Sequence, residues 1–342
     1  MSGLEILRSV GRRGFAAAAG VLLVLGVVAA TPQLLGSRVA DAVSALGDAD
    51  PRWLWLAGAG FAVAVLGAAG SWRSATGLCG GRLGMTDAAA RYGAGSLVNT
   101  FLPARAGDAV RFALFARTLD GSERLLRTGG AFAALGAARA VVLGALVVSG
   151  AALGAIPLWP VLAIAGLAAA AAGIAIGVRR REARGRFARL FDAFRTLGRE
   201  PRAAARLLGW LALSLAARVT AAAAVGAALG IGRPLAAALV IVPMLDVAGL
   251  VPVTPGNVGV TSGAVATIFQ THGVSFTHGL AAGIAFHAVE TAVGIAFGLG
   301  SLVWLAPYPT PATRRIAVLA SAASASLAVA GVLSATVLLP LV

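Results

Sequence analysis

The sequence predicts an all-α polytopic membrane protein with about seven full transmembrane helices. Hydrophobic residues make up 59% of the 342 residues and charged residues only 12%, whereas soluble domains average roughly 45–50% apolar and 25% charged residues. Apolar runs long enough to cross a bilayer of about 30 Å recur along the chain. We expect a single integral membrane domain over residues 1–342, with spans at 15–35, 53–71, 128–152, 158–178, 207–230, 278–305 and 316–341.

The first apolar run follows Arg8, Arg12 and Arg13 and has the order of regions found in a secretory signal peptide. We expect a retained span instead, because the apolar run continues through the residues PQLLG and the rest of the chain is itself embedded. Arginine-rich short loops mark the cytoplasmic side. The sequence therefore predicts a multi-pass protein of the cell membrane with a cytoplasmic N-terminus.

The basic residues are all arginine, and the formal charge is +15. In a soluble protein this balance would suggest nucleic acid, but here it is typical of cytoplasmic loops that face anionic lipid. We expect no nucleic-acid partner and an amphipathic arm at 179–206 that lies on the anionic cytoplasmic leaflet. The apolar residues of this arm recur at spacings of three and four: Phe187, Leu190, Phe191, Phe194 and Leu197.

The distribution of arginine requires two segments that enter and leave the membrane on the same side. The arginines after the second span and the arm at 179–206 should both be cytoplasmic, so residues 86–117 must return to the cytoplasmic side. Residues 234–272 must return to the outer side, because Arg314 and Arg315 should be cytoplasmic. The sequence therefore predicts two re-entrant helical hairpins inserted from opposite faces, as in inverted-repeat transporters.

Both predicted hairpins are interrupted in the middle by proline and glycine. LPARAGD at 102–108 matches VPVTPGN at 251–257 in the spacing of proline and glycine, which is a weak internal repeat. Non-helical backbone at membrane depth is tolerated where it is buried in protein or lines a wet cavity. We expect Pro252 and Pro255 to stop one half-helix, and Gly256 and Gly259 to let the backbone turn and a ligand approach. The next half-helix should start near Asn257, with free N–H groups that suit an anion. An ordinary extracellular turn is the alternative.

Ionisable side chains inside the predicted spans are candidate functional residues, because they are costly there and need a partner. Arg139 and Arg218 each lie twelve residues beyond the preceding arginine, which is roughly 18 Å deeper along a helix. Arg218 could form a structural ion pair with Asp246 or Glu290 instead of contacting a ligand. His287 lies three residues before Glu290, and the two could form a proton relay.

A second group of charges lies in the first predicted hairpin. Asp108 and Arg111 stand three residues apart and can share a helix face. Arg105 and Arg111 could instead extend to the cytoplasmic interface. If all the intramembrane charges converge, four arginines face two aspartates and one glutamate. The small positive excess suits a phosphate-bearing headgroup, which arginine can bind bidentately.

Two stretches resemble the lysylphosphatidylglycerol synthase transmembrane region, also described as a flippase-like domain family. They are YGAGSLVNTFLPARAGDAVRFALFAR, and VPVTPGNVGVTSG followed by GIAFHAVETAVGIAFGLG. Ser262 stands where relatives commonly have glutamate, so any role of that carboxylate would pass to Asp246 or Glu290. The resemblance implies a lipid-translocating domain and carries over onto Asn99, Pro103, Arg105, Gly107, Asp108, Arg111, Pro255, Gly256 and Gly259.

We expect a transporter that moves a lipid with an anionic, phosphate-bearing headgroup between leaflets, either a phospholipid or a polyprenyl-phosphate-linked sugar. The sequence has no Walker loop, GxSxG elbow or metal-ligand cluster, so we assign no catalytic residue, metal or cofactor. The expected lipid-binding residues are those carried over by the resemblance together with Arg139, Arg218, Asp246, Asn257, His287 and Glu290.

The alternative is an integral-membrane transferase, or an accessory subunit of one, that acts on the same lipid class. A separate cytosolic transferase is a possible partner in that case. The resemblance also covers synthases with a soluble aminoacyl-transferring domain, but we find no segment here that is long and polar enough to hold one. Lipid aminoacylation by this chain alone is therefore not expected.

Overall fold

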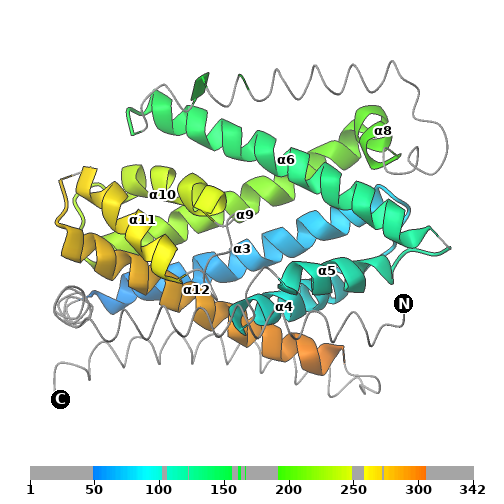
Figure 1. The fold of residues 1–342 in the computed structure, drawn as a ribbon, viewed down its shortest axis with the longest axis horizontal. Helices are drawn as coiled ribbons and strands as arrows, with labels where there is room; N and C mark the ends of the chain where they lie inside the picture. Colours follow the sequence, from blue (N-terminus) through cyan, green and yellow to red (C-terminus); the bar gives the residue numbers. More distant parts are fainter. Residues whose placement is uncertain are drawn as a thin grey trace.

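The computed structural model describes residues 49–101, 106–121, 123–155, 161–162, 166, 192–248, 258–271 and 273–305. The elements in these residues are helices (Figure 1). Their bounds are α3 Pro51–Gly77, α4 Met85–Phe101, α5 Ala106–Ala116, α6 Arg124–Ala152, α8 Asp192–Arg199, α9 Pro201–Ala228, α10 Pro234–Ala248, α11 Val258–Thr271 and α12 Phe276–Trp304.

Four of these helices, α3, α6, α9 and α12, are long and apolar enough to cross a membrane. They coincide with four of the predicted spans, those at 53–71, 128–152, 207–230 and 278–305. The helical fold and the helices at these four predicted positions are therefore confirmed. The other predicted spans, 15–35, 158–178 and 316–341, lie outside the described residues apart from 161–162 and 166.

Short sequence signals set where the long helices begin. Asp50 precedes α3, its carboxylate accepts the N–H of Arg52 at 2.9 Å, and a proline stands in the first turn. Helix α9 also begins with a proline, Pro201. Ser275 precedes α12 and accepts the N–H of His278 at 3.3 Å. The backbone N–H groups of a first turn lack partners within the helix. A side-chain acceptor bonds one of them, and a proline has no N–H that needs a partner.

Helices α3 and α9 pack closely as an antiparallel pair in the middle of the molecule (Figure 1). A Cβ atom at Gly67 would lie 2.8 Å from the backbone nitrogen of Ser214, and one at Gly60 would lie 3.0 Å from the carbonyl oxygen of Ala217. The Ser214 hydroxyl donates to the Ala64 carbonyl at 2.8 Å. Small residues allow this close approach. The resulting van der Waals contacts stabilise helix association in a bilayer, where the hydrophobic effect does not drive helices together.

Helix α4 packs antiparallel along the C-terminal half of α12. Near the start of α4, the indole nitrogen of Trp304 donates to Asp87 Oδ1 at 2.8 Å. Ten residues later in α4, Leu97 lies where it would touch a Cβ at Gly298, six residues earlier in α12. Helix α4 therefore runs from the C-terminal end of α12 towards its middle.

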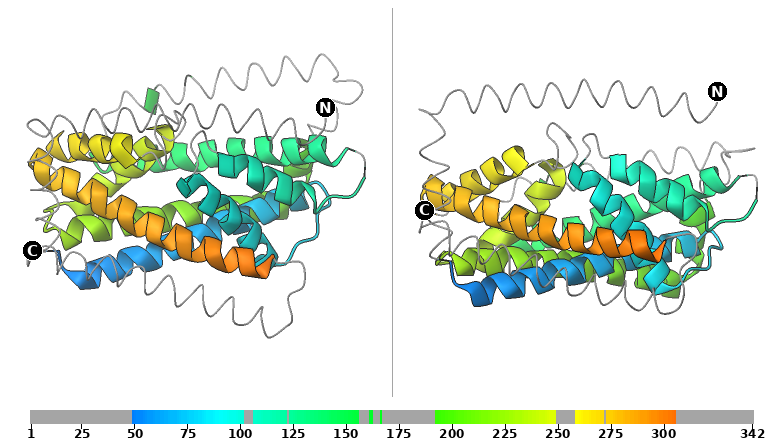
Figure 2. Two further views of the ribbon diagram at one scale, coloured as in Figure 1. Left: turned by 60° about the horizontal axis from the view of Figure 1, so that its bottom comes forward. Right: turned by 90° about the horizontal axis from the view of Figure 1, so that it is seen from below.

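Helix α11 packs antiparallel along the other half of α12. A Cβ at Gly279 would lie 2.8 Å from the Cα of Ala266, and one at Gly283 would lie 2.7 Å from the Cα of Ser262. The short pair α4 and α5 and the short pair α10 and α11 therefore lie towards opposite ends of α12 (Figures 1 and 2).

The order of long and short helices occurs twice. A long helix, two short helices and a long helix follow one another in α3–α6 and again in α9–α12. The contacts correspond as well: α4 packs on α12 as α10 packs on α6, and α5 packs on α6 as α11 packs on α12. Because α3 and α9 are antiparallel, the two groups of four helices have opposite directions.

The predicted arm at 179–206 is divided between two helices in its described part. Helix α8 ends at Arg199 and α9 begins at Pro201, so the last residues of the arm belong to a long helix. Ala193 of α8 is buried, Leu197 packs on the core beside it, and Phe194 is exposed. The start of the arm, 179–191, lies outside the described residues.

Candidate functional site

Asp246, in the last turn of α10, is the centre of a charged network. Its carboxylate accepts hydrogen bonds from Arg139 of α6, with Nε at 3.1 Å and Nη2 at 2.8 Å. It also accepts one from Nη1 of Arg218 in α9 at 2.9 Å. The Asp246 side chain is only 9% exposed. Two guanidinium groups from two long helices therefore hold one buried carboxylate of the second short pair.

Arg218 continues the network to α12. Its Nη2 donates to Oε1 of Glu290 at 3.0 Å, and Nδ1 of His287 lies 3.8 Å from Oε2 of the same glutamate. Both partners that the sequence allowed for Arg218, Asp246 and Glu290, are thus in contact with it at once. The network joins helices α6, α9, α10 and α12 at a depth where each charge needs a partner.

The network lies level with the interruption of the second short pair. The contacts of Gly279 with Ala266 and of Gly283 with Ser262 fix the antiparallel register of α11 and α12. One further turn of α12 brings His287 opposite the first turn of α11. Since Asp246 is in the last turn of α10, the charges gather where this pair of helices is broken.

A second polar cluster holds α4 and α5 together. Oδ1 of Asn99 accepts the N–H of Gly107 at 2.6 Å, and Nδ2 of Asn99 donates to Oδ1 of Asp108 at 3.3 Å. Nη1 of Arg111 donates to the same Asp108 oxygen at 2.6 Å. A Cβ at Gly107 would lie 2.5 Å from Asn99 Oδ1, so only glycine fits this close approach. Asn99 therefore caps α5 from a different helix.

Two residues that the sequence analysis missed complete this cluster. Nη2 of Arg111 donates to the Ser96 hydroxyl at 2.7 Å, and its Cζ lies 4.1 Å from the ring centroid of Tyr92. Tyr92, Ser96 and Asn99 follow one another at the spacing of one helix face, which is the signal that could have found them.

The expected positive excess is not present among the described charges. Each of the three arginines pairs with carboxylate, and the fourth predicted arginine, Arg105, lies outside the described residues. The pairs are Arg111 with Asp108, Arg139 and Arg218 with Asp246, and Arg218 with Glu290. A phosphate would therefore have to replace a carboxylate here, which arginine permits because it binds both groups with the same donors.

Several predicted site residues cannot be placed in the site. Helix α11 begins at Val258, directly after Asn257, and Gly259 lies in its first turn. The predicted site residues outside the described part of the chain are Pro103, Arg105, Pro255, Gly256 and Asn257.

Ser262 is 3% exposed, and among the described residues its hydroxyl has no hydrogen-bond partner. The same holds for Nε of Arg218. Buried polar atoms normally have partners, so these two atoms are exceptions within the described part of the chain.

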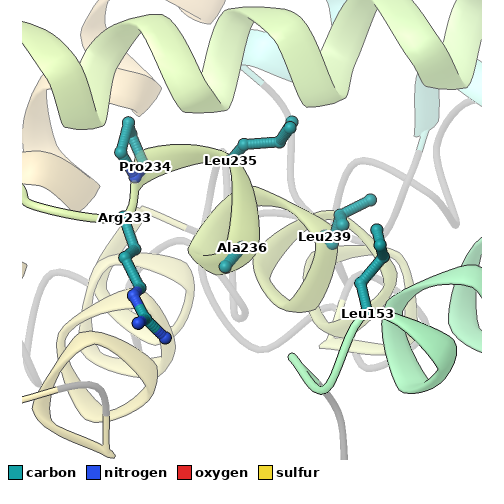
Figure 3. A pocket seen from close by; sticks show the side chains of 6 residues that line it. All are labelled: Leu153, Arg233, Pro234, Leu235, Ala236 and Leu239. Carbon is teal, nitrogen blue, oxygen red and sulfur yellow. The ribbon is translucent and has the colours of Figure 1, made fainter.

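A hollow of about 290 Å³ lies away from both clusters, between the end of α6 and the start of α10 (Figure 3). It contains none of the predicted site residues. Its lining is apolar apart from Arg233, and consists of Leu153, Arg233, Pro234, Leu235, Ala236 and Leu239.

Comparison with known proteins identifies the family. Neither the curated proteins nor the solved structures include a match to the chain. The family model described as lysylphosphatidylglycerol synthase TM region matches residues 17–298, a range that contains both clusters, helices α3, α6 and α9, and α12 as far as Gly298. The chain therefore belongs to the lysylphosphatidylglycerol synthase TM region family, as its early and late motifs suggested.

Proposed function

We propose that this protein moves a lipid with a phosphate-bearing, anionic headgroup between the leaflets of the cell membrane. One observation carries the proposal: the two short helix pairs approach α12 from opposite ends, and their inner ends reach it on either side of Glu290. The family, a membrane region related to lipid synthesis, supports a lipid partner.

The short pairs act as re-entrant hairpins in this proposal. Helices α4, α5, α10 and α11 have 17, 11, 15 and 14 residues, whereas crossing the hydrocarbon core takes about 20. Each pair turns back near the middle of α12, so its broken backbone would be buried in protein at membrane depth. The repeated order of helices with opposite directions fits an inverted repeat with a binding site at the midplane.

The arginine residues support an orientation. Arginine is concentrated at one end of the molecule. This end holds the loop from α3 to α4, the loop from α5 to α6, and α8, and it would be cytoplasmic. The opposite end has only Arg52 and Arg233 among the described residues. With the predicted first span, this orientation makes the N-terminus cytoplasmic. The described arginines of the cytoplasmic end are Arg73, Arg82, Arg91, Arg117, Arg124, Arg127, Arg195, Arg199, Arg202 and Arg206.

The headgroup phosphate would bind Arg139 and Arg218. Both side chains project donors at membrane depth, and the phosphate oxygens can take the place of the Asp246 carboxylate. Arg139 is the more accessible of the two, at 42% exposure against 17% for Arg218. The phosphate would therefore meet Arg139 first and Arg218 after it.

Reconstitution in liposomes tests the proposal. Purified protein is placed in vesicles that contain fluorescent phosphatidylglycerol or a fluorescent polyprenyl-phosphate-linked sugar, and the label in the outer leaflet is bleached chemically over time. We expect fast leaflet exchange of one of these lipids without chemical change. Arg218→Leu should abolish it, whereas Arg206→Leu, an exposed arginine on the same helix, should leave it intact. A new lipid product in place of exchange would favour the transferase.

A further inference from the structure

The helices around the charged network are packed unequally. Glycines bring α4 and α11 close to α12, at Gly298 and Gly283. Helix α6, the counterpart of α12 in the repeated order, has fewer close contacts within the described part of the chain: a Cβ at Gly136 would meet none of its atoms within 4 Å. In its most apolar stretch 22% of residues are buried, against 44% in α12. Helix α6 is thus freer to move than α12.

The two halves of α6 differ as well. The first half is anchored, because Ala134 and Leu135 are buried and Phe132 packs 5.5 Å from Trp72 between ring centroids. The second half is more exposed, with Val141 at 64% and Val148 at 50% exposure. An anchored first half and an exposed second half allow α6 to swing about its middle, near Arg139.

The second half of α6 packs on α10. The hollow of about 290 Å³ lies at one end of this contact, with Leu153 of the α6 end close to Leu239 of α10 and Arg233 at its edge (Figure 3). The Arg139–Asp246 pair lies at the other end, fourteen residues before Leu153, or about 21 Å along a helix. We call the contact of α6 with α10 between these two points the α6–α10 seam.

The Arg139–Asp246 ion pair, at the inner end of the seam, can separate while each charge still has access to a partner. If Arg139 moves away, Asp246 keeps the hydrogen bond from Nη1 of Arg218 at 2.9 Å. Arg139 is already 42% exposed, so its guanidinium can reach a new partner. A phosphate provides that partner with the same bidentate geometry as the carboxylate.

We propose that the α6–α10 seam is the lateral path by which a membrane phospholipid reaches the charged network, with the Arg139–Asp246 pair as its latch. The apolar hollow takes acyl chain, and the headgroup phosphate replaces Asp246 on Arg139 as the second half of α6 swings out. This inference rests on the proposed lipid transport and adds the place of entry and the residue pair that controls it.

Fluorescence quenching by lipid tests entry without relying on transport. A fluorophore is attached at Leu239→Cys in a Cys79→Ser background, and the protein is placed in phosphatidylglycerol and phosphatidylethanolamine vesicles with brominated acyl chains. We expect quenching to rise at least twofold in Asp246→Asn, which opens the latch. Asp87→Asn is the control, because this carboxylate bonds Trp304 outside the charged network and leaves Arg139 and Asp246 paired, so quenching should not change. Equal quenching in the two variants would overturn the latch.

Cross-linking then tests whether the seam must open during transport. Leu153→Cys with Leu239→Cys is joined by a short, reducible thiol cross-linker. The control is the same cross-linker between Asp87→Cys and Trp304→Cys, which joins α4 to α12 where the two native side chains are in contact. We expect the first cross-link to reduce leaflet exchange at least tenfold until it is reduced, and the control to have no such effect.

The outcomes separate this inference from the proposed function. Unchanged exchange with the seam cross-linked overturns the seam as the entry path and leaves lipid transport standing. No exchange by any variant, reduced protein included, refutes the proposed transport. In that case the quenching experiment still decides whether lipid enters the seam and whether the Arg139–Asp246 pair limits it.

Discussion

The backbone N–H of Gly107 donates to Oδ1 of Asn99 at 2.6 Å, so a side chain of α4 caps the first turn of α5. With the hydrogen bonds of Asn99 to Asp108 and of Arg111 to Ser96, this bond holds the two helices of the first short pair together. We expect Asn99→Ala to lower the free energy of unfolding by about 1 kcal/mol, the usual effect of losing a cap. Thermal unfolding in detergent measures it. Thr100→Ala, which removes a hydroxyl bonded within α4, should be milder, and an equal loss would contradict the capping role.

Gly107 itself should tolerate no side chain. Alanine there would press on Asn99 and on the backbone of Gly95, and such overpacking costs about 1–3 kcal/mol. Gly136→Ala, a glycine in α6 with open space around its Cβ position, should instead be neutral or stabilise the helix by up to about 1 kcal/mol. Comparing the unfolding midpoints of the two variants checks this. Similar midpoints would mean that α4 and α5 can separate at low cost.

Arg218 and Arg139 should differ in their effect on stability. Arg218→Leu leaves both Asp246 and Glu290 without this donor, and breaking a buried pair costs about 3–5 kcal/mol. Arg139→Leu leaves Asp246 paired with Arg218, so the stability loss should be smaller while transport still falls. Folded yield and leaflet exchange are measured on both variants. Parallel loss of folded protein and activity in both would support a purely structural ion-pair network.

The proposed topology places Arg91 and Asp120 on one side of the membrane and Arg233 on the other. In a Cys79→Ser background, a membrane-impermeant thiol reagent should label Arg91→Cys and Asp120→Cys from the cytoplasmic side. Arg233→Cys, at an exposed position, should be labelled from the outside. Labelling of Arg91→Cys and Asp120→Cys from opposite sides would mean that α4 and α5 together cross the membrane.

The interruption of the second short pair should respond to backbone shape more than to side-chain chemistry. If the start of α11 binds phosphate, the donors are mainly backbone N–H groups. Gly256→Val and Gly259→Val should therefore block lipid binding by obstructing close approach. Asn257→Ser should be mild, because serine is also a good cap. Native mass spectrometry of lipid complexes measures the three variants, and normal binding by both valine variants would remove this segment from the site.

The sequence was most informative where a single helix carries the signal. Apolar length located α3, α6, α9 and α12, and proline with glycine marked the stretches that follow α4 and α10. The depth of Arg218 in its span required a partner, and the two carboxylates considered for it, Asp246 and Glu290, both contact it. In each case the information lies within one helix, where spacing along the sequence fixes position in space.

Features that depend on register between helices could not be predicted in the same way. The stacking of Arg111 on Tyr92 needs the rotation of α5 against α4, which a single sequence does not state. The close contacts at Gly279 and Gly283 require a partner helix whose identity only the fold reveals. The expected positive excess assumed that all the charges meet at one point, whereas the structure divides them into two clusters.

Every described guanidinium of the charged network is paired with a carboxylate. This pairing decides how the network responds to the membrane potential. Arg139 and Arg218 balance Asp246 and Glu290 in charge, so a movement of these four groups together does no work against the membrane potential. In the proposed transport, the headgroup would then carry the charge that senses the voltage, at about 2.3 kcal/mol per elementary charge for each 100 mV. An inside-negative potential would favour outward movement of a singly anionic headgroup and oppose its inward movement from the α6–α10 seam.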